Sequence, residues 1–322
     1  MKLISWNMAH RKEAWYHLVE TGADIALLQE APPPPQDIAL RIGTDEEPWR
    51  TDSADAVRPW RTAVVRLSER VQVDWLKPVP IDEAVGGELA VSRRGTLAAA
   101  EVRDSNGARY TVVSMYGLWE RPHRSTNSRW IYADASVHRL ISDLSALIGQ
   151  QGGHRIIAAG DLNILHGYGE EGSRYWGGRY QTVFQRMESL GLIFLGPQAP
   201  NGRRADPWPR ELPEDSDNLP TYHTARMTPA QATRQLDFVF GSGCLAERVQ
   251  VAALNELSEW GPSDHCRVSI TILSRVVGRG EGIGSLFSLC LSSLSLRGTS
   301  DRVLDAFLQS DPTPVGQAWS GG

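Results

Sequence analysis

Short apolar runs that end in polar residues alternate with helical patterns along the first 273 residues of the chain. Apolar stretches bounded by turn-forming residues are typical of strands, whereas apolar residues three and four positions apart are typical of amphipathic helices. The pattern predicts strands at 2–7, 24–30, 62–67, 96–104, 109–116, 154–160, 234–240, 248–254 and 266–273. It predicts helices at 11–22, 129–148 and 180–191, and a hairpin turn at Asn106-Gly107.

Many strands with a few interspersed helices favour an α+β sandwich, in which sheets pack on each other and helices lie outside. Two segments, 31–37 and 201–220, are rich in proline and polar residues and are expected to be loops. From residue 274 onward the pattern gives way to Gly, Ser and Leu. We therefore expect one domain at 1–273 and an appended, largely disordered tail at 274–322.

Composition changes this picture little. The chain has 322 residues, 41% of them hydrophobic, which is enough for a sizeable core. Its formal charge of -5 provides no general basic field, so a polyanion must be held by a local basic patch or by a metal ion. The three cysteines have no ligand spacing and are expected to be reduced thiols.

The sequence also supports expectations about cellular location and partners. No apolar signal-peptide region follows Lys2, and the apolar stretch at 283–296 is too short to span a bilayer. We expect a cytoplasmic protein that does not associate with membranes. No feature of the sequence indicates an obligate protein partner.

A set of polar residues falls at or beside the predicted strand ends. Burying an unpaired carboxylate or amide costs several kcal/mol, so a core has little use for many of them. If the strand ends converge, these side chains line one site. The set comprises Asn7, Glu30, Tyr116, Asp161, Asn163, Asp237, Asp264 and His265.

Each of these positions, taken alone, also has a structural interpretation. The stretch Gly160 to Asn163 has the composition of a turn, and Asp264 after Pro262 is an ordinary turn residue. Asn7 is compatible with a strand-end cap. A lone histidine such as His265 is more often structural than catalytic. The functional interpretation therefore depends on the positions together.

The motifs SWN, LLQE, GDLN, LDFVF and SDH occur in this order along the chain. With these motifs the chain resembles the metal-dependent endonuclease/exonuclease/phosphatase superfamily. That group includes exonuclease III-like and deoxyribonuclease I-like enzymes, sphingomyelinases and inositol polyphosphate phosphatases. The resemblance covers residues 1 to about 273 and implies a four-layer αββα sandwich with the active site at one end.

The resemblance implies hydrolysis of phosphate esters with a divalent metal. Carboxylate and amide oxygens are hard ligands that suit Mg²⁺ or Mn²⁺. Such an ion offsets the charge that builds on the phosphoryl oxygens. Glu30, Asp264 and the amide of Asn7 are the expected ligands.

The resemblance also implies roles for the remaining residues. Asp161 is the expected acceptor of a proton from the attacking water, and the Asn163 amide would orient that water. Asp237 would hold His265, which donates a hydrogen bond to the phosphate. Tyr116 completes the expected catalytic set and is typical of the exonuclease III-like branch rather than of branches that carry histidine there.

Departures from the pattern bear on the substrate. The residues after Tyr116 lack the Pro-Asn pair that is common in the exonuclease III-like branch, and Ala9 stands where apurinic endonucleases carry an acidic residue. Both differences argue against specificity for abasic sites. The loop 118–130 interleaves arginines with tryptophans, as in nucleic-acid-binding surfaces, although a solvated loop would have the same composition. Its candidate substrate-binding residues are Trp119, Arg121 and Arg124, and 221–226 forms a second candidate rim.

The sequence therefore predicts a Mg²⁺- or Mn²⁺-dependent hydrolase of phosphate esters, with a nuclease or phosphodiesterase acting on DNA or RNA as the first hypothesis. A phosphomonoesterase or small-molecule phosphodiesterase of the same fold is the second, and the acidic pI of about 5.9 favours it. A binding protein that has lost catalysis is the third. The expected partner is nucleic acid or another phosphoester.

Overall fold

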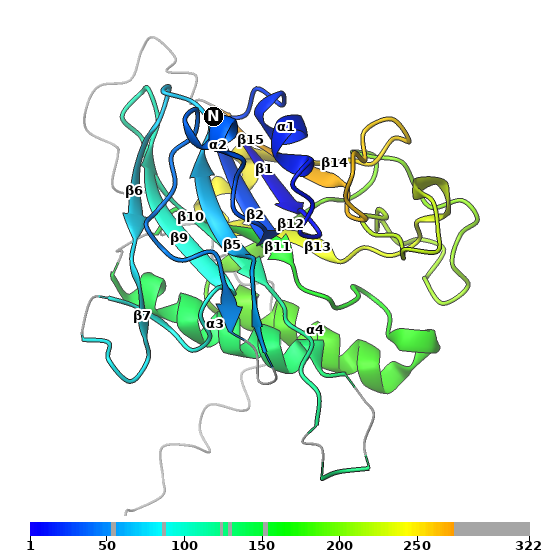
Figure 1. The fold of residues 1–322 in the computed structure, drawn as a ribbon. Coiled ribbons are helices and arrows are strands. Elements are labelled where there is room, and N and C mark those ends of the chain that lie inside the picture. Colours follow the sequence, from blue (N-terminus) through cyan, green and yellow to red (C-terminus); the bar gives the residue numbers. More distant parts are fainter. Residues whose placement is uncertain (53–55, 86–87, 123–124, 128–130, 151–153, 274–322) are drawn as a thin grey trace, which may run out of the picture. The chain divides into compact units, whose positions relative to one another are not determined.

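The computed structural model of the chain describes residues 1–52, 56–85, 88–122, 125–127, 131–150 and 154–273, with the backbone alone at 149 and 150 (Figure 1). The tail predicted at 274–322 lies outside the described residues. Within 1–273 two large mixed sheets lie face to face, and each carries helices on its outer face (Figure 1).

The first sheet has the strand order β14-β15-β1-β2-β5. Its strands are β1 (Lys2–Asn7), β2 (Ile25–Ala31), β5 (Arg61–Arg66), β14 (Val249–Leu254) and β15 (Arg267–Ile272). The parallel pairing of β1 and β2 sets Asn7 opposite Gln29. The ends of these two strands, and with them Asn7 and Glu30, therefore lie at the same edge of the sheet.

The second sheet has the strand order β12-β13-β11-β10-β9-β6. Its strands are β6 (Gln72–Leu76), β9 (Leu97–Arg103), β10 (Arg109–Tyr116), β11 (Ile156–Asp161), β12 (Leu192–Gly196) and β13 (Asp237–Ser242). The register sets Tyr116 opposite Asp161 on one side and Asp237 opposite Asp161 on the other. Three predicted site residues therefore form one row across the sheet.

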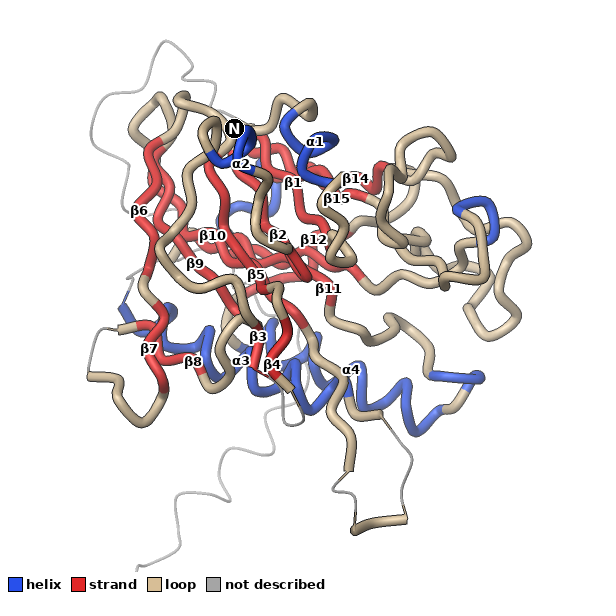
Figure 2. The backbone as a smooth tube through the Cα atoms, viewed as in Figure 1, coloured by secondary structure: helices blue, strands red, loops and turns tan. Residues whose placement is uncertain are grey.

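Helices close the sandwich on both sides. α3 (Ala133–Gln150) and α4 (Arg174–Ser189) cover the outer face of the second sheet, where Leu144 and Val183 belong to the same buried cluster as Phe238 (Figure 2). On the first sheet, Trp15 of α1 (Ala14–Val19) packs in a cluster with Leu28. The short helix α2 (Gln36–Ala39) follows β2 along the chain. A third cluster joins the inner faces of the two sheets. The expected αββα order of layers is confirmed.

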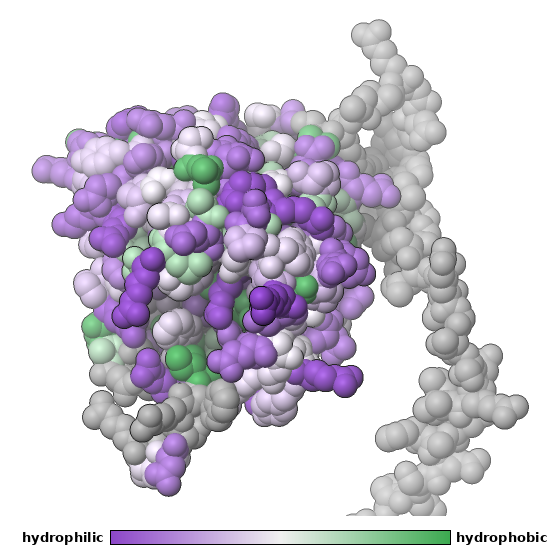
Figure 3. All heavy atoms as spheres, turned by 90° about the vertical axis from the view of Figure 1, so that its right-hand side faces the viewer, coloured by the Kyte–Doolittle hydropathy of each residue, from purple (hydrophilic) through white to green (hydrophobic). Residues whose placement is uncertain are grey.

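Smaller elements connect these layers. β3 (Thr51–Asp52) pairs with β4 (Val57–Arg58), and β7 (Pro78–Pro80) pairs with β8 (Leu89–Val91). Three short 3₁₀ helices lie at Glu170–Gly172, Pro229–Gln231 and Gly243–Arg248. In the part of the chain that the structure describes, no helix combines the length and the apolar character needed to cross a bilayer. The face drawn in Figure 3 is mostly hydrophilic, with hydrophobic residues in small separate areas.

The sequence located most elements but misjudged several boundaries. α4 begins at Arg174 instead of 180, because Gly177 and Gly178 weaken the helical pattern of a first turn that the capping side chain of Ser173 supports. The helix expected at 11–22 is shorter, and β6 and β12 were not predicted. The predicted hairpin turn is present, with Gly107 at a φ of 78°.

Candidate active site

Asp161 ends β11 and is almost completely buried, and its carboxylate is held by amide donors. The Asn7 side chain donates to Oδ2 across 2.8 Å, and the Asn163 side chain donates to the same oxygen across 3.1 Å. The backbone N–H of Asn163 donates to Oδ1 across 2.9 Å. Asn163 has a φ of 51°, a left-handed conformation that asparagine tolerates. The GDLN stretch is therefore a turn that also fixes a buried carboxylate.

Glycine is required before Asp161 because β10 and β11 approach closely. A Cβ on Gly160 would lie 1.8 Å from the carbonyl oxygen of Met115. Directly after the end of β10, a Cβ on Gly117 would lie 2.3 Å from the carbonyl oxygen of Leu162. The Asn163 amide donates to the Gly117 oxygen across 3.0 Å. The close approach that the two glycines permit, together with this hydrogen bond, holds the two strand ends side by side and brings Tyr116 beside Asp161.

His265 lies between two buried carboxylates. Its Nδ1 donates to Oδ2 of Asp237 across 2.8 Å, and its Nε2 is 3.7 Å from Oδ2 of Asp161. Burial lowers the pKa of His265, but the charges of Asp237 and Asp161 outweigh that effect and raise the pKa above its usual value. Burial, together with the charge of Asp237, raises the pKa of Asp161 although His265 opposes it. The geometry favours an imidazolium whose Nε2 faces Asp161 at a distance too long for a good hydrogen bond.

The SDH segment that carries His265 is tied to the first sheet. The Ser263 hydroxyl donates to the backbone oxygen of Asn7 across 2.7 Å and accepts from the His265 N–H across 3.1 Å. The indole N–H of Trp6 donates to the His265 carbonyl across 2.9 Å. Tyr222, from the predicted rim 221–226, places its ring centroid 4.8 Å from that of His265. Both sheets therefore determine where the histidine lies.

Glu30 lies in the left-handed region at the end of β2, with a φ of 46°. The Tyr116 hydroxyl donates to Oε1 across 2.5 Å, and Nδ1 of His10 lies 2.9 Å from Oε2. Burial raises the pKa of Glu30, but the hydrogen bonds from His10 and Tyr116 outweigh it and lower the pKa below its usual value. Burial and the charge of Glu30 raise the pKa of Tyr116 far above its usual range. At neutral pH this pair is a carboxylate beside a protonated phenol.

His10 is a member of the site that the sequence analysis missed. Its ring stacks on Trp60 with centroids 5.7 Å apart, and Trp60 meets Tyr116 edge-on at 5.4 Å. The Arg58 guanidinium lies 5.3 Å from the Trp60 centroid. The backbone at Ala9 and His10 turns through two left-handed residues, with φ of 45° and 50°. No local pattern marks such a turn, and Trp60 is distant in the sequence.

The types of donor atom in this site, carboxylate and amide oxygens, suit a hard divalent cation. The described residues contain no ready-made group of three or more His, Cys, Asp or Glu side chains arranged to hold a metal ion. Mg²⁺ is commonly held by only one or two carboxylates, and water and substrate phosphate oxygens complete its shell. Glu30 and Asp264 can supply these carboxylates. The Asn7 amide donates to Asp161 and accepts from the Ala9 N–H, so its role as a ligand stays a prediction.

The structure describes part of the predicted substrate-binding loop. Leu118 packs with Trp60 and Tyr116, and the next residue, Trp119, is 54% exposed. Arg121 is also exposed. Arg124 lies outside the described residues, as do 128–130. The loop leaves β10 directly at the row of site residues.

Comparison with known proteins identifies the fold. No protein-family model and no curated protein matches the chain. An AP endonuclease from Leishmania major is similar in structure, with a TM-score of 0.55 and 15% identity over 85% of this chain and 87% of that one. The endonuclease domain of TRAS1, a telomere-specific non-LTR retrotransposon, has a TM-score of 0.54 and 16% identity over 85% of this chain and 99% of that one. A 3'-5' exonuclease from Neisseria meningitidis has a TM-score of 0.51 and 16% identity over 85% of this chain and 100% of that one.

These identities are low enough that the likeness concerns the fold alone. The chain has the α+β sandwich of the endonuclease/exonuclease/phosphatase type, as the motifs predicted.

Proposed function

We propose that the protein is a Mg²⁺- or Mn²⁺-dependent phosphoester hydrolase that cleaves phosphodiester bonds in nucleic acid. The observation that carries the proposal is the group of Asn7, Asp161 and Asn163, joined by hydrogen bonds, which meets the hydrogen-bonded pair of Asp237 and His265 at one end of the sandwich, with Glu30 beside it. The names of the structural neighbours, two endonucleases and an exonuclease, support the same chemistry. A buried charge cluster of this kind is costly to keep without a function.

A divalent ion bound by Glu30 and Asp264 would offset the negative charge that builds on the phosphoryl group. Glu30 is suited to this task because its lowered pKa keeps it ionised at neutral pH. The Asp264 carboxylate makes no hydrogen bond or ion pair with any residue that the structure describes.

Asp161 is the proposed acceptor of the proton from the attacking water. Three N–H donors fix its two oxygens, and a carboxylate has about four lone-pair sites, so one site stays available for a water molecule. The remaining site is on Oδ1; the Asn163 side chain donates to the neighbouring Oδ2 and to the Gly117 carbonyl, so it would orient that water through its own amide oxygen. The fixed carboxylate needs no rearrangement to act as a general base.

His265 is the proposed donor to the phosphate. Its Nδ1 is committed to Asp237, which fixes the ring and leaves Nε2 to donate. Because Nε2 is 3.7 Å from Asp161, a phosphate oxygen can take this proton as its main acceptor. The Tyr116 hydroxyl, which donates to Glu30, would hold that carboxylate in place.

The test is a substrate panel of single-stranded DNA, duplex DNA, RNA and a chromogenic phosphodiester, each with Mg²⁺, with Mn²⁺ and with EDTA. The Asp161→Asn variant should lose about a thousandfold in turnover, the usual scale of general-base catalysis. Asp104→Asn, in the hairpin at the opposite end of β10, is the matched control and should keep full activity. Metal-independent turnover, or full activity of Asp161→Asn, would refute the mechanism.

The net charge of -5 favours a second candidate, a phosphomonoesterase or a phosphodiesterase for small substrates. The same panel separates the two. Preference for a chromogenic monoester or diester over every nucleic acid would select the second candidate. Binding without any turnover would select a protein that has lost catalysis.

A further inference from the structure

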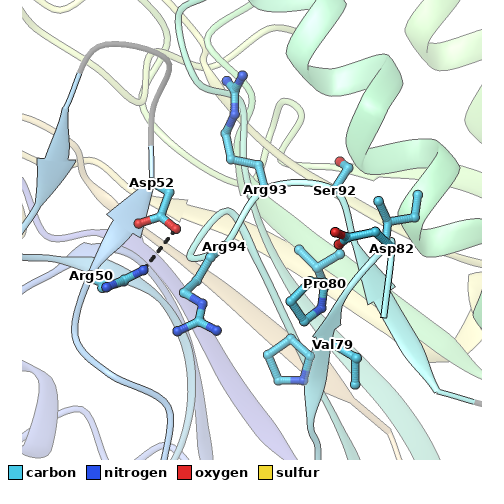
Figure 4. A pocket seen from close by; sticks show the side chains of 11 residues that line it. Arg50, Asp52, Val79, Pro80, Asp82, Ser92, Arg93 and Arg94 are labelled. Carbon is cyan, nitrogen blue, oxygen red and sulfur yellow. Dashed lines mark hydrogen bonds and ion pairs between the residues drawn. The ribbon is translucent and has the colours of Figure 1, made fainter. Parts of the chain in front are cut away.

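A pocket of about 450 Å³ lies apart from the residues discussed so far, between Arg50 and Asp52 on one side and the strands β7 and β8 on the other (Figure 4). It belongs to the same end of the sandwich as the candidate active site. The Tyr116 N–H donates to the carbonyl of Thr96, two residues after Arg94 of the pocket lining. On the other side, the Thr51 hydroxyl donates to the carbonyl of Trp60 across 2.6 Å.

These links give a continuous path from the catalytic residues to the pocket. Trp60 contacts Tyr116 and carries the stacked ring of His10, which reaches Glu30. Arg50 and Asp52, the neighbours of Thr51, line the pocket.

Three arginines and two aspartates line the pocket, so its lining carries a small excess of positive charge. Arg50 pairs with Asp52 at 3.3 Å, and Arg93 pairs with Glu120 at 3.3 Å. Arg94 has no carboxylate within ion-pair distance among the residues that the structure describes. In Figure 4 its side chain extends between Arg50 and the side occupied by Pro80 and Val79. A guanidinium without a partner is a ready donor of paired hydrogen bonds to a phosphate.

The opposite wall is apolar and stiff. Pro78, Val79 and Pro80 form β7, and Val91 of β8 lies next to them in the lining. Ile81, which also lines the pocket, is 62% exposed although it is a large hydrophobic residue. Such a wall offers an aromatic ring a dry surface at little entropic cost, because proline rings have no freedom to lose. Phosphate-binding charge therefore faces a surface suited to a nucleobase.

We propose that this pocket is a subsite for one unpaired nucleotide of the substrate strand, with its phosphate on Arg94 and its base against the wall of β7. The proposal rests on the proposed function and narrows its substrate class to nucleic acid with a single-stranded stretch beside the cleaved bond. The volume falls within the range of about 300 to 1,000 Å³ that is typical of small-molecule sites. A nucleotide that is paired and stacked in a duplex cannot place its base in such a pocket.

The experiment measures equilibrium binding without catalysis. Fluorescence anisotropy of a labelled single-stranded oligonucleotide is recorded in EDTA, so that no cleavage occurs, for the wild-type protein and for Arg94→Ala. The dissociation constant of the variant should rise by roughly tenfold, equivalent to about 1.4 kcal/mol. Its salt dependence should become shallower by about one phosphate contact. Arg94→Lys, which keeps the charge, should retain most of the salt dependence.

Three further arms make the result specific. Arg109→Ala, an exposed arginine at the start of β10 and thus at the opposite end of the sandwich, is the matched control and should bind as the wild type does. Asp82→Asn removes an exposed carboxylate from the lining and should strengthen binding. Val79→Asp sets a charge on the apolar wall and should weaken binding of the single strand more than binding of a blunt duplex.

Equal binding of the oligonucleotide by wild type and Arg94→Ala would overturn the subsite, and so would failure of the wild type to bind it at all. Equal losses on single strand and duplex would overturn the assignment to an unpaired nucleotide. If binding depends on Arg94 while the wild type hydrolyses no phosphoester with either metal, the proposed function fails and the subsite stands.

Discussion

The candidate site has two parts that are built differently. The inner group, Asn7, Asp161, Asn163, Asp237 and His265, is held by hydrogen bonds among its own members, and four of the five are less than 5% exposed. In the outer group, His10, Glu30, Trp60 and Asp264, exposure varies: the His10 side chain is 57% exposed and that of Glu30 15%, whereas Trp60 is buried. Buried polar networks are rigid when every member is satisfied, whereas exposed contacts can rearrange.

The difference matches two chemical tasks. Groups that move a proton must be fixed before the substrate arrives, because errors of about 1 Å already reduce the rate strongly. Groups that admit a cation and a polyanion must exchange partners. Glu30 accepts hydrogen bonds from His10 and Tyr116, and the side chain of His10 is largely exposed. The predictions below test whether the two groups respond to substitution as differently as their construction suggests.

The largest effect is expected from breaking the inner group at Asp237. The Asp237→Asn variant leaves His265 without its carboxylate, so both the ring orientation and the charged form lose their support. Turnover should fall by about a thousandfold, within the range found for positioned acid and base groups. Steady-state kinetics with circular dichroism as a check on folding would measure it. A loss below about tenfold would show that the pair is structural.

A smaller loss, about a hundredfold in turnover, is expected from Glu30→Gln, because the substitution removes a charge that we propose binds the metal and leaves the inner group intact. Calorimetric titration with Mn²⁺ should show weaker binding by the variant. Glutamine can still accept from Tyr116, so the fold should be unaffected. Near-normal turnover at saturating Mg²⁺ would remove Glu30 from the metal site.

The construction of the two groups also explains what could be read from the sequence. The inner residues lie at strand ends, and strand ends follow from hydrophobic patterns. Once β10, β11 and β13 are placed side by side, the register brings Tyr116, Asp161 and Asp237 together. The αββα layers follow from the same alternation of strands and helices.

Only part of the outer group could be derived in this way, because Glu30 and Asp264 were predicted from the sequence and His10 and Trp60 were not. His10 reaches Glu30 through a turn in which Ala9 and His10 both adopt left-handed backbone angles, which alanine rarely does. Trp60 meets His10 through tertiary packing between segments far apart in the chain. The pocket beside Arg94 depends on short strands whose pairing has no sequence signature.

His10→Gly should separate the outer group from the inner one. Glycine accepts the left-handed φ of 50° without strain, so the substitution removes the ring and leaves the turn. Without the His10 donor, the Glu30 carboxylate is easier to engage, and Mn²⁺ should bind more tightly by roughly severalfold, or about 1 kcal/mol. Calorimetric titration in the absence of substrate provides the readout. Unchanged or weaker Mn²⁺ binding would show that His10 does not compete for the carboxylate.

The smallest effect concerns His166, a histidine outside both groups. Its ring centroid lies 4.5 Å from that of Phe184 and 4.7 Å from that of Phe194. Its Nδ1 lies 3.1 Å from Oδ1 of Asn218. Burial lowers the pKa of His166, and the hydrogen bond that its ring donates to Asn218 only partly opposes that shift, in contrast to the raised pKa of His265 between its carboxylates. His166 therefore binds a proton more readily in the unfolded chain than in the folded protein.

Stability contributed by neutral His166 is present above the unfolded pKa of about 6.5 and is lost as the pH falls below it. Denaturant unfolding at about pH 8 and about pH 5.5 should show a steeper loss in the wild type than in His166→Gln, which keeps a polar side chain for Asn218 but does not titrate. The difference in slope cannot exceed about 1.4 kcal/mol per pH unit for one proton. Parallel slopes would mean that the ring accepts its proton inside the folded core as readily as in water.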